Sequence, residues 1–266
     1  MTSPNTLGTA LITGASTGIG AAYADRLARR GYDLILVARN RERLSALASS
    51  LATATGRQVS TLAADLNDRG DLAKVEEVLA TDPSITLLVN NAGVGAVAPL
   101  VSTSVDEMEA LIDLNVTALT RLTYAAAPAF VRRGAGTIIQ IASAVGISPE
   151  TLNGVYGASK AFVIALTQSL QYELASKGVR VQVVLPGATA TPFWDVAGMP
   201  VSDLPDDFVM TTDHLVDAAL AGLDMGEVYT IPSLADIAQF DAYEAARLAM
   251  VPNLSKAKPA ARYGLQ

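Results

Sequence analysis

Short β-rich runs that alternate with longer helical patterns constrain the fold of this chain more than any other feature. Several of these runs are apolar at nearly every position, as in parallel strands that helices cover on both faces. The segments between the runs are long enough for crossover helices. The alternation therefore predicts an α/β fold built on a doubly wound parallel sheet. The seven runs occupy residues 9–12, 33–38, 59–64, 85–90, 136–142, 179–185 and 227–232.

A long helix is predicted to begin after Ser104. This serine forms a capping box with Glu107, three positions later. The helix is expected to run toward Arg132 and to stop at Gly134, because a basic last turn followed by glycine is typical of a helix end. Pro128 lies inside this span and is expected to kink or shorten the helix.

A second long helix is predicted from about residue 155 to residue 177. Phe162, Leu166, Leu170 and Leu174 recur at a spacing of four, and other faces of the same segment are apolar too. A helix that is apolar nearly all round has to be covered on more than one side. We expect the sheet to cover one side and, as a hypothesis, a second subunit to cover the other.

The chain is expected to form one domain over residues 1–266. No repeat, linker or low-complexity segment interrupts it. The longest segment without a strand pattern is rich in glycine and proline and spans residues 186–207. Long loops of this kind are usually functional lids or flexible segments. We therefore expect a substrate loop at about 188–212.

Composition argues against several classes of protein. The net charge of −7 makes a nucleic-acid surface a poor expectation, since phosphate binding needs clustered Lys and Arg. The absence of cysteine and the single histidine, His214, argue against a disulfide framework and a zinc site. No apolar stretch approaches the ~20 residues that cross a bilayer, and residues 1–16 do not resemble a signal peptide. We expect no metal, no nucleic acid and no membrane, and a cytoplasmic location.

Three glycines follow the first β-rich run. Gly14, Gly18 and Gly20 stand between that run and the first helical pattern, in the sequence "TGASTGIG". Glycines in such a turn let the backbone approach a pyrophosphate, and the following helix N-terminus offers free N–H groups and a partial positive charge. The motif favours a dinucleotide site. The alternative is a tight strand–helix turn that binds no ligand.

The end of the second run carries information on the coenzyme. An acid at this position binds a free ribose 2′-hydroxyl, whereas a basic residue suits a 2′-phosphate. The sequence "LVARNRERL" has no acid at the end of the run, and Arg39 is the best placed of its three arginines. A guanidinium binds phosphate in a bidentate fork. We therefore expect NADP(H) rather than NAD(H); the alternative is that the arginines only solvate the start of a helix.

Tyr156 and Lys160 lie one helical turn apart on an apolar stretch. A pair of this kind is weak evidence alone. Ser143 stands thirteen positions before the tyrosine, just beyond the fifth run. Chance places such a serine with such a pair only roughly 0.01 times in a chain of this composition. Together the three residues suggest a proton-transfer site.

With these motifs in order, the chain resembles the short-chain dehydrogenase/reductase family, in its branch of about 250 residues. The resemblance covers almost the whole chain. It implies a Rossmann-like sheet of seven strands, a nicotinamide cofactor, and homodimers or homotetramers built through the two long helices. It depends on "TGASTGIG" (13–20), "NNAG" (90–93), Asn115, Ser143, Tyr156, Lys160 and "PGATAT" (186–191).

The resemblance also implies a role for particular residues. Tyr156 would exchange a proton with the substrate oxygen, which Ser143 would hold by a hydrogen bond. Lys160 would grip the nicotinamide ribose, and Asn115 would keep a water in place that links Lys160 to solvent. The cofactor would contact Gly14, Ser16, Thr17, Gly18, Ile19, Gly20, Arg39, Asp65, Leu66, Asn91, Ala92, Gly93, Tyr156, Lys160, Pro186, Gly187, Thr189 and Thr191.

Electrostatics suggests how a phenol would act near neutral pH. Free tyrosine has a pKa near 10. An ammonium ~4 Å away at an effective dielectric of ~20 contributes about 4 kcal/mol, or about three pKa units. Desolvation would remove part of this effect. We therefore expect Lys160 to bring the pKa of Tyr156 toward 7, where proton transfer is efficient.

Each assignment has a simpler alternative. Ser143 would also serve as a cap at the end of a strand. Asn115 would also suit a solvent-facing position on a helix, and Asp65 resembles a helix N-cap. Thr13 and Thr191 would also fit as turn residues.

The substrate is expected to be a small to medium ketone, aldehyde or secondary alcohol with an apolar body. The candidate pocket residues Val97, Val145, Phe193 and Trp194 are apolar, and the loop 186–205 contains no Lys or Arg that would bind an anion. Two other functions remain as alternatives. A non-catalytic NADP(H)-binding redox sensor would not need Ser143, Tyr156 and Lys160 together. A methyltransferase on a similar sheet would bind adenosylmethionine and leave the tyrosine–lysine pair idle.

Overall fold

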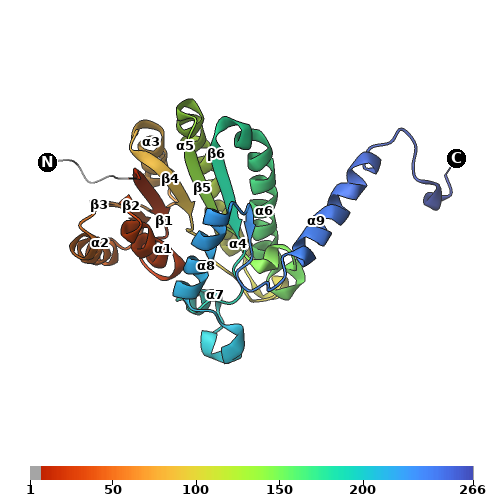
Figure 1. The fold of residues 1–266 in the computed structure, drawn as a ribbon. Helices are drawn as coiled ribbons and strands as arrows, with labels where there is room; N and C mark the ends of the chain where they lie inside the picture. Colours follow the sequence, from red (N-terminus) through yellow and green to blue (C-terminus); the bar gives the residue numbers. More distant parts are fainter. Residues whose placement is uncertain (1–6, 266) are drawn as a thin grey trace. The chain divides into compact units, whose positions relative to one another are not determined.

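The computed structural model describes residues 7–265 (Figure 1). Residues 1–6 and 266 lie outside this range, and with them part of the N-terminus that is expected to lack a signal peptide. Contacts divide the chain into two compact units, Met1–Pro232 and Ser233–Gln266. The single domain over 1–266 stays a prediction.

A seven-stranded parallel sheet forms the centre of the first unit. Its order is β3-β2-β1-β4-β5-β6-β7, and every neighbouring pair is parallel. The predicted α/β, Rossmann-like, doubly wound architecture is confirmed. Each predicted run contains a strand, although β7 is shorter than its run. The strands are β1 Thr9–Thr13, β2 Asp33–Ala38, β3 Val59–Ala63, β4 Ile85–Asn90, β5 Gly136–Ile141, β6 Val179–Val184 and β7 Tyr229–Thr230.

Helices cover both faces of this sheet (Figure 1). Alternate residues of β1 point to opposite faces, as strand geometry requires. Ile12 belongs to a core with α1, α2 and α8, whereas Leu11 belongs to a core with α3, α5 and α6. The sheet is therefore buried on both sides. The helices of this unit are α1 Gly18–Arg29, α2 Arg41–Thr55, α3 Arg69–Thr81, α4 Val105–Ile112, α5 Leu119–Arg133, α6 Gly154–Leu174, α7 Phe193–Ala197 and α8 Thr212–Met225.

The first predicted long helix is interrupted, and the position of the interruption differs from the prediction. The capping box of Ser104 and Glu107 is present at the start of α4. A π-helical turn, Asp113–Ala118, then separates α4 from α5. Pro128 lies within α5, which continues to Arg133 before Gly134 ends it in the left-handed conformation. The sequence contains no signal for the π turn, whose cause is tertiary.

The second predicted long helix is α6, and its ends agree with the prediction. Asn153 caps its N-terminus, and Gly178 ends the short 3-10 segment Ala175–Lys177 that follows it. Leu170 and Leu174 pack into the core under the sheet, whereas Phe162 is 39% exposed. One side of α6 is thus covered, and the second subunit expected on its other side stays a prediction.

The predicted loop at about 188–212 links β6 to α8. It contains α7 and two 3-10 turns, Val201–Asp203 and Asp206–Phe208. Its base is held by backbone hydrogen bonds of Met210, which donates to Ala188 and accepts from Ala190. The loop is therefore attached at both ends to the edge of the sheet where the strands terminate.

The second unit consists of α9 Ala238–Met250 followed by the 3-10 turns Val251–Asn253 and Ala261–Tyr263. Within α9, Arg247 forms an ion pair with Glu244 at 2.9 Å. Over residues 7–265, none of the helices combines the length and the hydropathy that spanning a bilayer requires. The same residues contain no cluster of three or more His, Cys, Asp or Glu side chains suited to a metal ion.

Candidate active site

The predicted site residues follow the ends of strands on one edge of the sheet. The glycine turn follows β1, Arg39 follows β2, and Asp65 and Leu66 follow β3. The segment 91–93 follows β4, Ser143 follows β5, and the segment 186–191 follows β6. In parallel sheets the crevice outside these carboxyl ends is where ligands bind. Chain topology alone thus brings together residues that are far apart in sequence.

The glycine turn is packed too tightly for side chains. A Cβ on Gly20 would lie 2.6 Å from Nδ2 of Asn91 and 2.9 Å from the carbonyl carbon of Gly14. Gly14 and Gly18 both have positive φ, at 64° and 56°. Thr17 stands at the N-cap of α1, and its side chain makes no capping hydrogen bond. The turn therefore presents backbone and a helix N-terminus to the crevice, which suits a pyrophosphate.

Thr13 and Asn91 support this turn from behind. The Thr13 hydroxyl accepts hydrogen bonds from the backbone N–H groups of Asn91 and Ala92, both at 3.0 Å. The Asn91 amide donates to the carbonyl oxygens of Thr13 and Gly14, at 2.9 and 3.2 Å. Because Asn91 uses its amide on the turn, it acts here as a brace. The simpler alternative for Thr13, a plain turn residue, misses this role.

The segment after β6 returns to the glycine turn. A Cβ on Gly18 would lie 3.1 Å from Cγ2 of Thr191. Thr189 is buried and donates its hydroxyl hydrogen to the carbonyl oxygen of Gly187 at 3.1 Å. The glycine turn and the predicted cofactor residues 186–191 therefore lie against each other at the position of Thr191. These residues fit an extended dinucleotide.

The predicted residues after β2 and β3 differ in their surroundings. Arg39 is exposed and has no ion-pair partner among the described residues, so its guanidinium is available to a ligand. Asp65 accepts a hydrogen bond from the N–H of Asn67 at 3.0 Å. The N-cap of α3 is Asp68, so the alternative of Asp65 as a helix cap is wrong. Leu66 is buried in the core beneath α3 and α5.

Ser143, Tyr156 and Lys160 meet beside this crevice. Tyr156 and Lys160 lie on the first turns of α6 and are 5% and 6% exposed. The Lys160 ammonium donates to the carbonyl oxygen of Ile141 at 3.0 Å, and Nζ lies 5.8 Å from the centroid of the Tyr156 ring. The Ser143 hydroxyl donates to the carbonyl oxygen of Pro186 at 3.3 Å. Ser143 also caps the 3-10 turn Ala144–Gly146. The alternative role of Ser143, as a cap at the end of a strand, is therefore present as well.

Asn115 sits in the π-helical turn and is buried. Its amide nitrogen donates to the carbonyl oxygen of Val94 and to the Ser159 hydroxyl, at 2.9 and 3.1 Å. Its amide oxygen accepts from the Val94 N–H at 3.0 Å. The alternative of a solvent-facing Asn115 is therefore wrong. Its side chain links Val94, in the segment after β4, to Ser159 on α6. Such π turns are frequent at functional positions.

Burial dominates the titration of the tyrosine and the lysine. Burial raises the pKa of the Tyr156 phenol to about 12, and a hydrogen bond with Ser143 opposes this only in part. Burial alone lowers the pKa of the Lys160 ammonium to about 8. The expectation that Lys160 brings the pKa of Tyr156 toward 7 is thus wrong in direction. Loss of water around the phenolate outweighs an ammonium that lies beside the ring.

An apolar cluster surrounds the phenol. Ala96, Leu111, Val145 and Tyr156 are buried together, with Phe193 packed against them. Two of the predicted pocket residues, Val145 and Phe193, therefore lie in this cluster. Trp194 lies edge-on to Phe193, with ring centroids 5.6 Å apart, and Val97 is half-buried outside the cluster.

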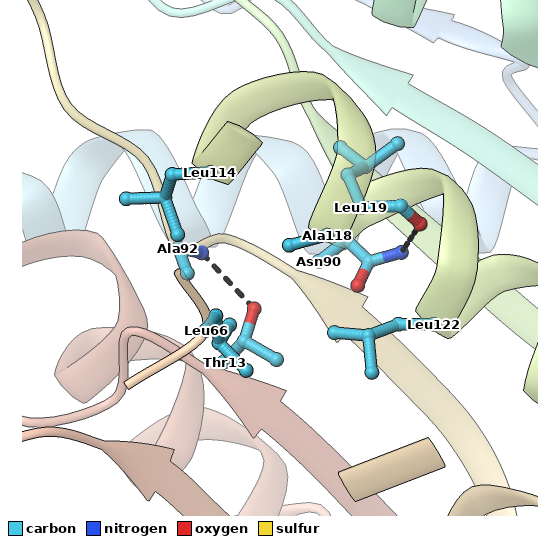
Figure 2. Close-up of a pocket in the computed structure, with 8 residues that line it drawn as sticks. All are labelled: Thr13, Leu66, Asn90, Ala92, Leu114, Ala118, Leu119 and Leu122. Atoms are coloured by element: carbon cyan, nitrogen blue, oxygen red, sulfur yellow. Dashed lines mark hydrogen bonds between the residues drawn. The ribbon is translucent and has the colours of Figure 1, made fainter. Parts of the chain in front are cut away.

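A small pocket lies beside Asn90, the last residue of β4 (Figure 2). The Asn90 amide points across it to the Leu119 carbonyl oxygen and also donates to the Thr123 hydroxyl at 3.0 Å. Gln140, next to Asn90 in the sheet register, donates to the same hydroxyl at 2.9 Å. This polar contact fixes α5 on the sheet. The pocket is lined by Thr13, Leu66, Asn90, Ala92, Leu114, Ala118, Leu119 and Leu122.

Sequence reasoning missed several residues that shape the site. Ser159 receives the Asn115 amide and donates to the Tyr156 carbonyl oxygen at 2.7 Å. Asn153 caps α6 and donates to the Ala98 carbonyl oxygen at 2.7 Å, which ties the segment after β4 to the start of α6. The capping preference of asparagine would have identified Asn153. Nothing in the sequence would have identified Ser159.

Comparison with known proteins agrees with this geometry. The family model for short chain dehydrogenases matches residues 8–198. The short-chain dehydrogenase from Sphingobium yanoikuyae, solved in complex with NADPH, is 50% identical with a TM-score of 0.93, covering 96% of this chain and 98% of that one. The bulky-bulky ketone specific alcohol dehydrogenase from Comamonas testosteroni is 44% identical with a TM-score of 0.90, covering 97% and 99%.

A curated relative extends the comparison. Sulfoacetaldehyde reductase 2 from Chromohalobacter salexigens is 40% identical over 187 residues, which are 69% of this chain and 73% of the relative. The family match agrees with the parallel seven-stranded sheet and with the glycine turn. The chain therefore belongs to the short-chain dehydrogenase/reductase family, as an NAD(P)-dependent oxidoreductase that acts on CH–OH groups.

Proposed function

We propose that this protein reduces a ketone or aldehyde to an alcohol, or catalyses the reverse reaction, with NADP(H) as its preferred coenzyme. The observation that carries the proposal is the meeting of Ser143, Tyr156 and Lys160 at the edge of the sheet that also carries the glycine turn. These three side chains are buried among apolar neighbours, yet each carries a polar group at the same edge of the sheet. Burying the Lys160 ammonium is costly, since among the described residues it has a single hydrogen bond, to Ile141, and a bound ligand that accepts from it would offset part of that cost.

In this proposal the bound nicotinamide supplies or accepts the hydride. Tyr156, whose pKa is raised to about 12, is protonated at neutral pH and donates its proton to the carbonyl oxygen during reduction. Ser143 holds that oxygen by a hydrogen bond. Lys160 keeps one donor on Ile141 and has two further N–H groups for a ribose hydroxyl. The protonated phenol is the form that the reductive direction requires.

The glycine turn and the N-terminus of α1 would hold the pyrophosphate, and Thr191 would close the crevice over it. Arg39 would bind the 2′-phosphate, because its guanidinium is exposed and without an ion-pair partner among the described residues. The test compares kcat/KM for NADPH and NADH in wild type and in Arg39→Gln. We expect the variant to lose about tenfold or more with NADPH, since charge-assisted hydrogen bonds contribute about 1.5–3 kcal/mol, and to change little with NADH. Equal use of both coenzymes by the wild type would remove the NADP(H) preference.

The substrate would be a ketone, aldehyde or secondary alcohol with an apolar body. The walls around Tyr156 are apolar, and the loop 188–212 carries Asp195, Asp203, Asp206 and Asp207 but no Lys or Arg. This loop would repel an anion, although one relative is a sulfoacetaldehyde reductase. A panel of apolar ketones and of sulfonated or carboxylated aldehydes, followed by NADPH absorbance, tests the assignment. Activity on the anionic compounds alone would contradict it.

We also propose that the chain forms a homodimer or homotetramer through α5 and α6. Tyr124 on α5 is 68% exposed and Tyr172 on α6 is 91% exposed, so both helices present aromatic rings that a second subunit would cover. Light scattering at micromolar concentration measures the state directly. A monomer at all concentrations would contradict this assembly.

A further inference from the structure

The ring of Phe193 covers the proposed catalytic phenol. Phe193 is the first residue of α7, and its ring centroid lies 5.7 Å from that of Tyr156, with the ring planes at 49°. Phe193 is half-buried, and Tyr156 is only 5% exposed. A substrate that approaches the phenol from this side would therefore have to displace this ring.

Gly95 provides the space in which the ring lies. A Cβ at this position would lie 2.7 Å from Cε2 and 2.8 Å from Cε1 of Phe193. Gly95 is not among the glycines with positive φ, so its backbone would accept any residue. The glycine is therefore required for space and not for conformation. The missing side chain leaves a space that the tip of a phenyl ring fills.

Hydrogen bonds fix the segment that carries Phe193, whereas the ring itself is held by packing against apolar neighbours. The Trp194 indole donates from Nε1 to the Thr189 carbonyl oxygen at 2.8 Å and is 7% exposed. Met210 anchors the base of the loop to Ala188. The Phe193 ring contacts the rings on either side of it at centroid distances of 5.6 and 5.7 Å. A change of side-chain rotamer would move the ring away from Gly95 while the loop stays in place.

We propose that the space between Gly95 and Tyr156, which the Phe193 ring fills, is the subsite for the larger substituent of the ketone and takes an apolar ring of about phenyl size. This inference rests on the proposed function. The surrounding Ala96, Leu111 and Val145 are apolar. A substrate ring that replaces the protein ring buries a similar apolar area, so the exchange conserves hydrophobic stabilisation.

A kinetic comparison tests the subsite. Cyclohexyl methyl ketone serves as the ring-bearing substrate and acetone as the small one. Gly95→Val fills the space, and we expect the ratio of kcat/KM for the ring ketone over acetone to fall about tenfold or more. Gly154→Ala is the matched control, because its Cβ would meet nothing within 4 Å and its φ is not positive. Gly95→Ala replaces Gly95→Val if the larger residue prevents folding. An unchanged ratio in a folded variant overturns the proposal.

Fluorescence gives a second readout that needs no turnover. Trp194 is the chain's single tryptophan and lies edge-on to Phe193, so its emission reports a movement of that ring. We expect a saturable emission change when cyclohexyl methyl ketone is added to wild type and to Gly154→Ala, and none with Gly95→Val. Absence of the change in wild type overturns the subsite. If the change is present but no ketone or aldehyde is turned over, the proposed function fails while the subsite stands.

Discussion

Gly20 and Gly95 are both packed too closely for a side chain, but different groups pack against them. A Cβ on Gly20 would meet the carbonyl group of Gly14, which is main chain, and the Asn91 amide. A Cβ on Gly95 would meet the end of the Phe193 ring. Main chain in a packed core cannot move without its neighbours, whereas a ring tip can rotate. The proposed cofactor side, at Gly20, is thus fixed, and the proposed substrate side, at Gly95, is adjustable.

The surroundings of the two regions explain the difference. The glycine turn joins β1 to α1, both of which belong to a core that extends to α2 and α8. Thr13 and Asn91 add hydrogen bonds behind it. The loop after β6 consists of α7 and short 3-10 turns, and Phe208 within it is 64% exposed. A fixed glycine turn would suit a cofactor that is the same in every turnover. A loop with few core contacts would suit substrates that differ in shape.

The largest effect is expected at the proposed proton donor, Tyr156, which lies between the two regions. Tyr156→Phe removes the proton donor and keeps the ring, so we expect kcat to fall by about 10²–10⁴ on any accepted ketone. The free energy of unfolding should change by only about 1 kcal/mol, the typical value of the lost hydrogen bond with Ser143. NADPH oxidation rates and chemical denaturation measure the two quantities. Retention of most activity would favour another proton donor, and absence of activity in the wild type would favour the redox sensor.

The titration of Lys160 tests whether water reaches its buried ammonium beside Tyr156. Burial lowers the pKa of Lys160 from 10.5 to about 8, so the unfolded chain binds its proton more tightly than the folded one. The free energy of unfolding of wild type should therefore rise from pH 8 to 10.5, by up to about 3 kcal/mol, relative to Lys160→Met. Above pH 10 the raised pKa of Tyr156 removes stability from both proteins alike. Parallel pH profiles for the two proteins would show that water reaches the ammonium.

The two glycines allow a direct comparison by the same substitution. Gly20→Ala forces main chain apart and should lower the free energy of unfolding by about 1–3 kcal/mol, with weaker NADPH binding. Gly95→Ala should cost less than about 1 kcal/mol, because the Phe193 ring rotates away. Urea denaturation and NADPH titration measure both variants under the same conditions. Equal destabilisation at both positions would abolish the distinction between the two regions.

The smallest effect is expected at the ion pairs between α1, which follows the glycine turn, and α8, which follows the substrate loop. Arg26 contacts Asp213 at 3.1 Å and Asp217 at 2.7 Å, and both carboxylates are more than half exposed. Such pairs contribute about 0–1 kcal/mol. Arg26→Ala should lower the free energy of unfolding by less than about 1 kcal/mol at low salt and by less still at high salt. A larger loss would show that these charges, and not the apolar contacts of α1 with α8, hold the helices together.

Patterns local to the sequence gave the framework of the fold. The strands, the capping box at Ser104, and the stop at Gly178 after the 3-10 segment that follows α6 are all predictable from neighbouring residues. The π turn at Asn115 does not, because it depends on contacts with Val94 and Ser159. The sequence suggested candidate site residues, but it could not suggest the residues that contact them.

The sequence by itself determined which chemical groups stand at the strand ends, because the hydrophobic patterns of strands and helices are set by neighbouring residues. The carboxyl ends of parallel strands meet at one edge of the sheet, so these groups are expected there together. Tertiary structure alone decided how water is excluded around those groups. It raises the pKa of Tyr156 where the lysine one turn away suggested the reverse. It also places the Phe193 ring in the space at Gly95. Burial and close packing are properties of segments distant in the chain, so spacing along the sequence carries no record of them.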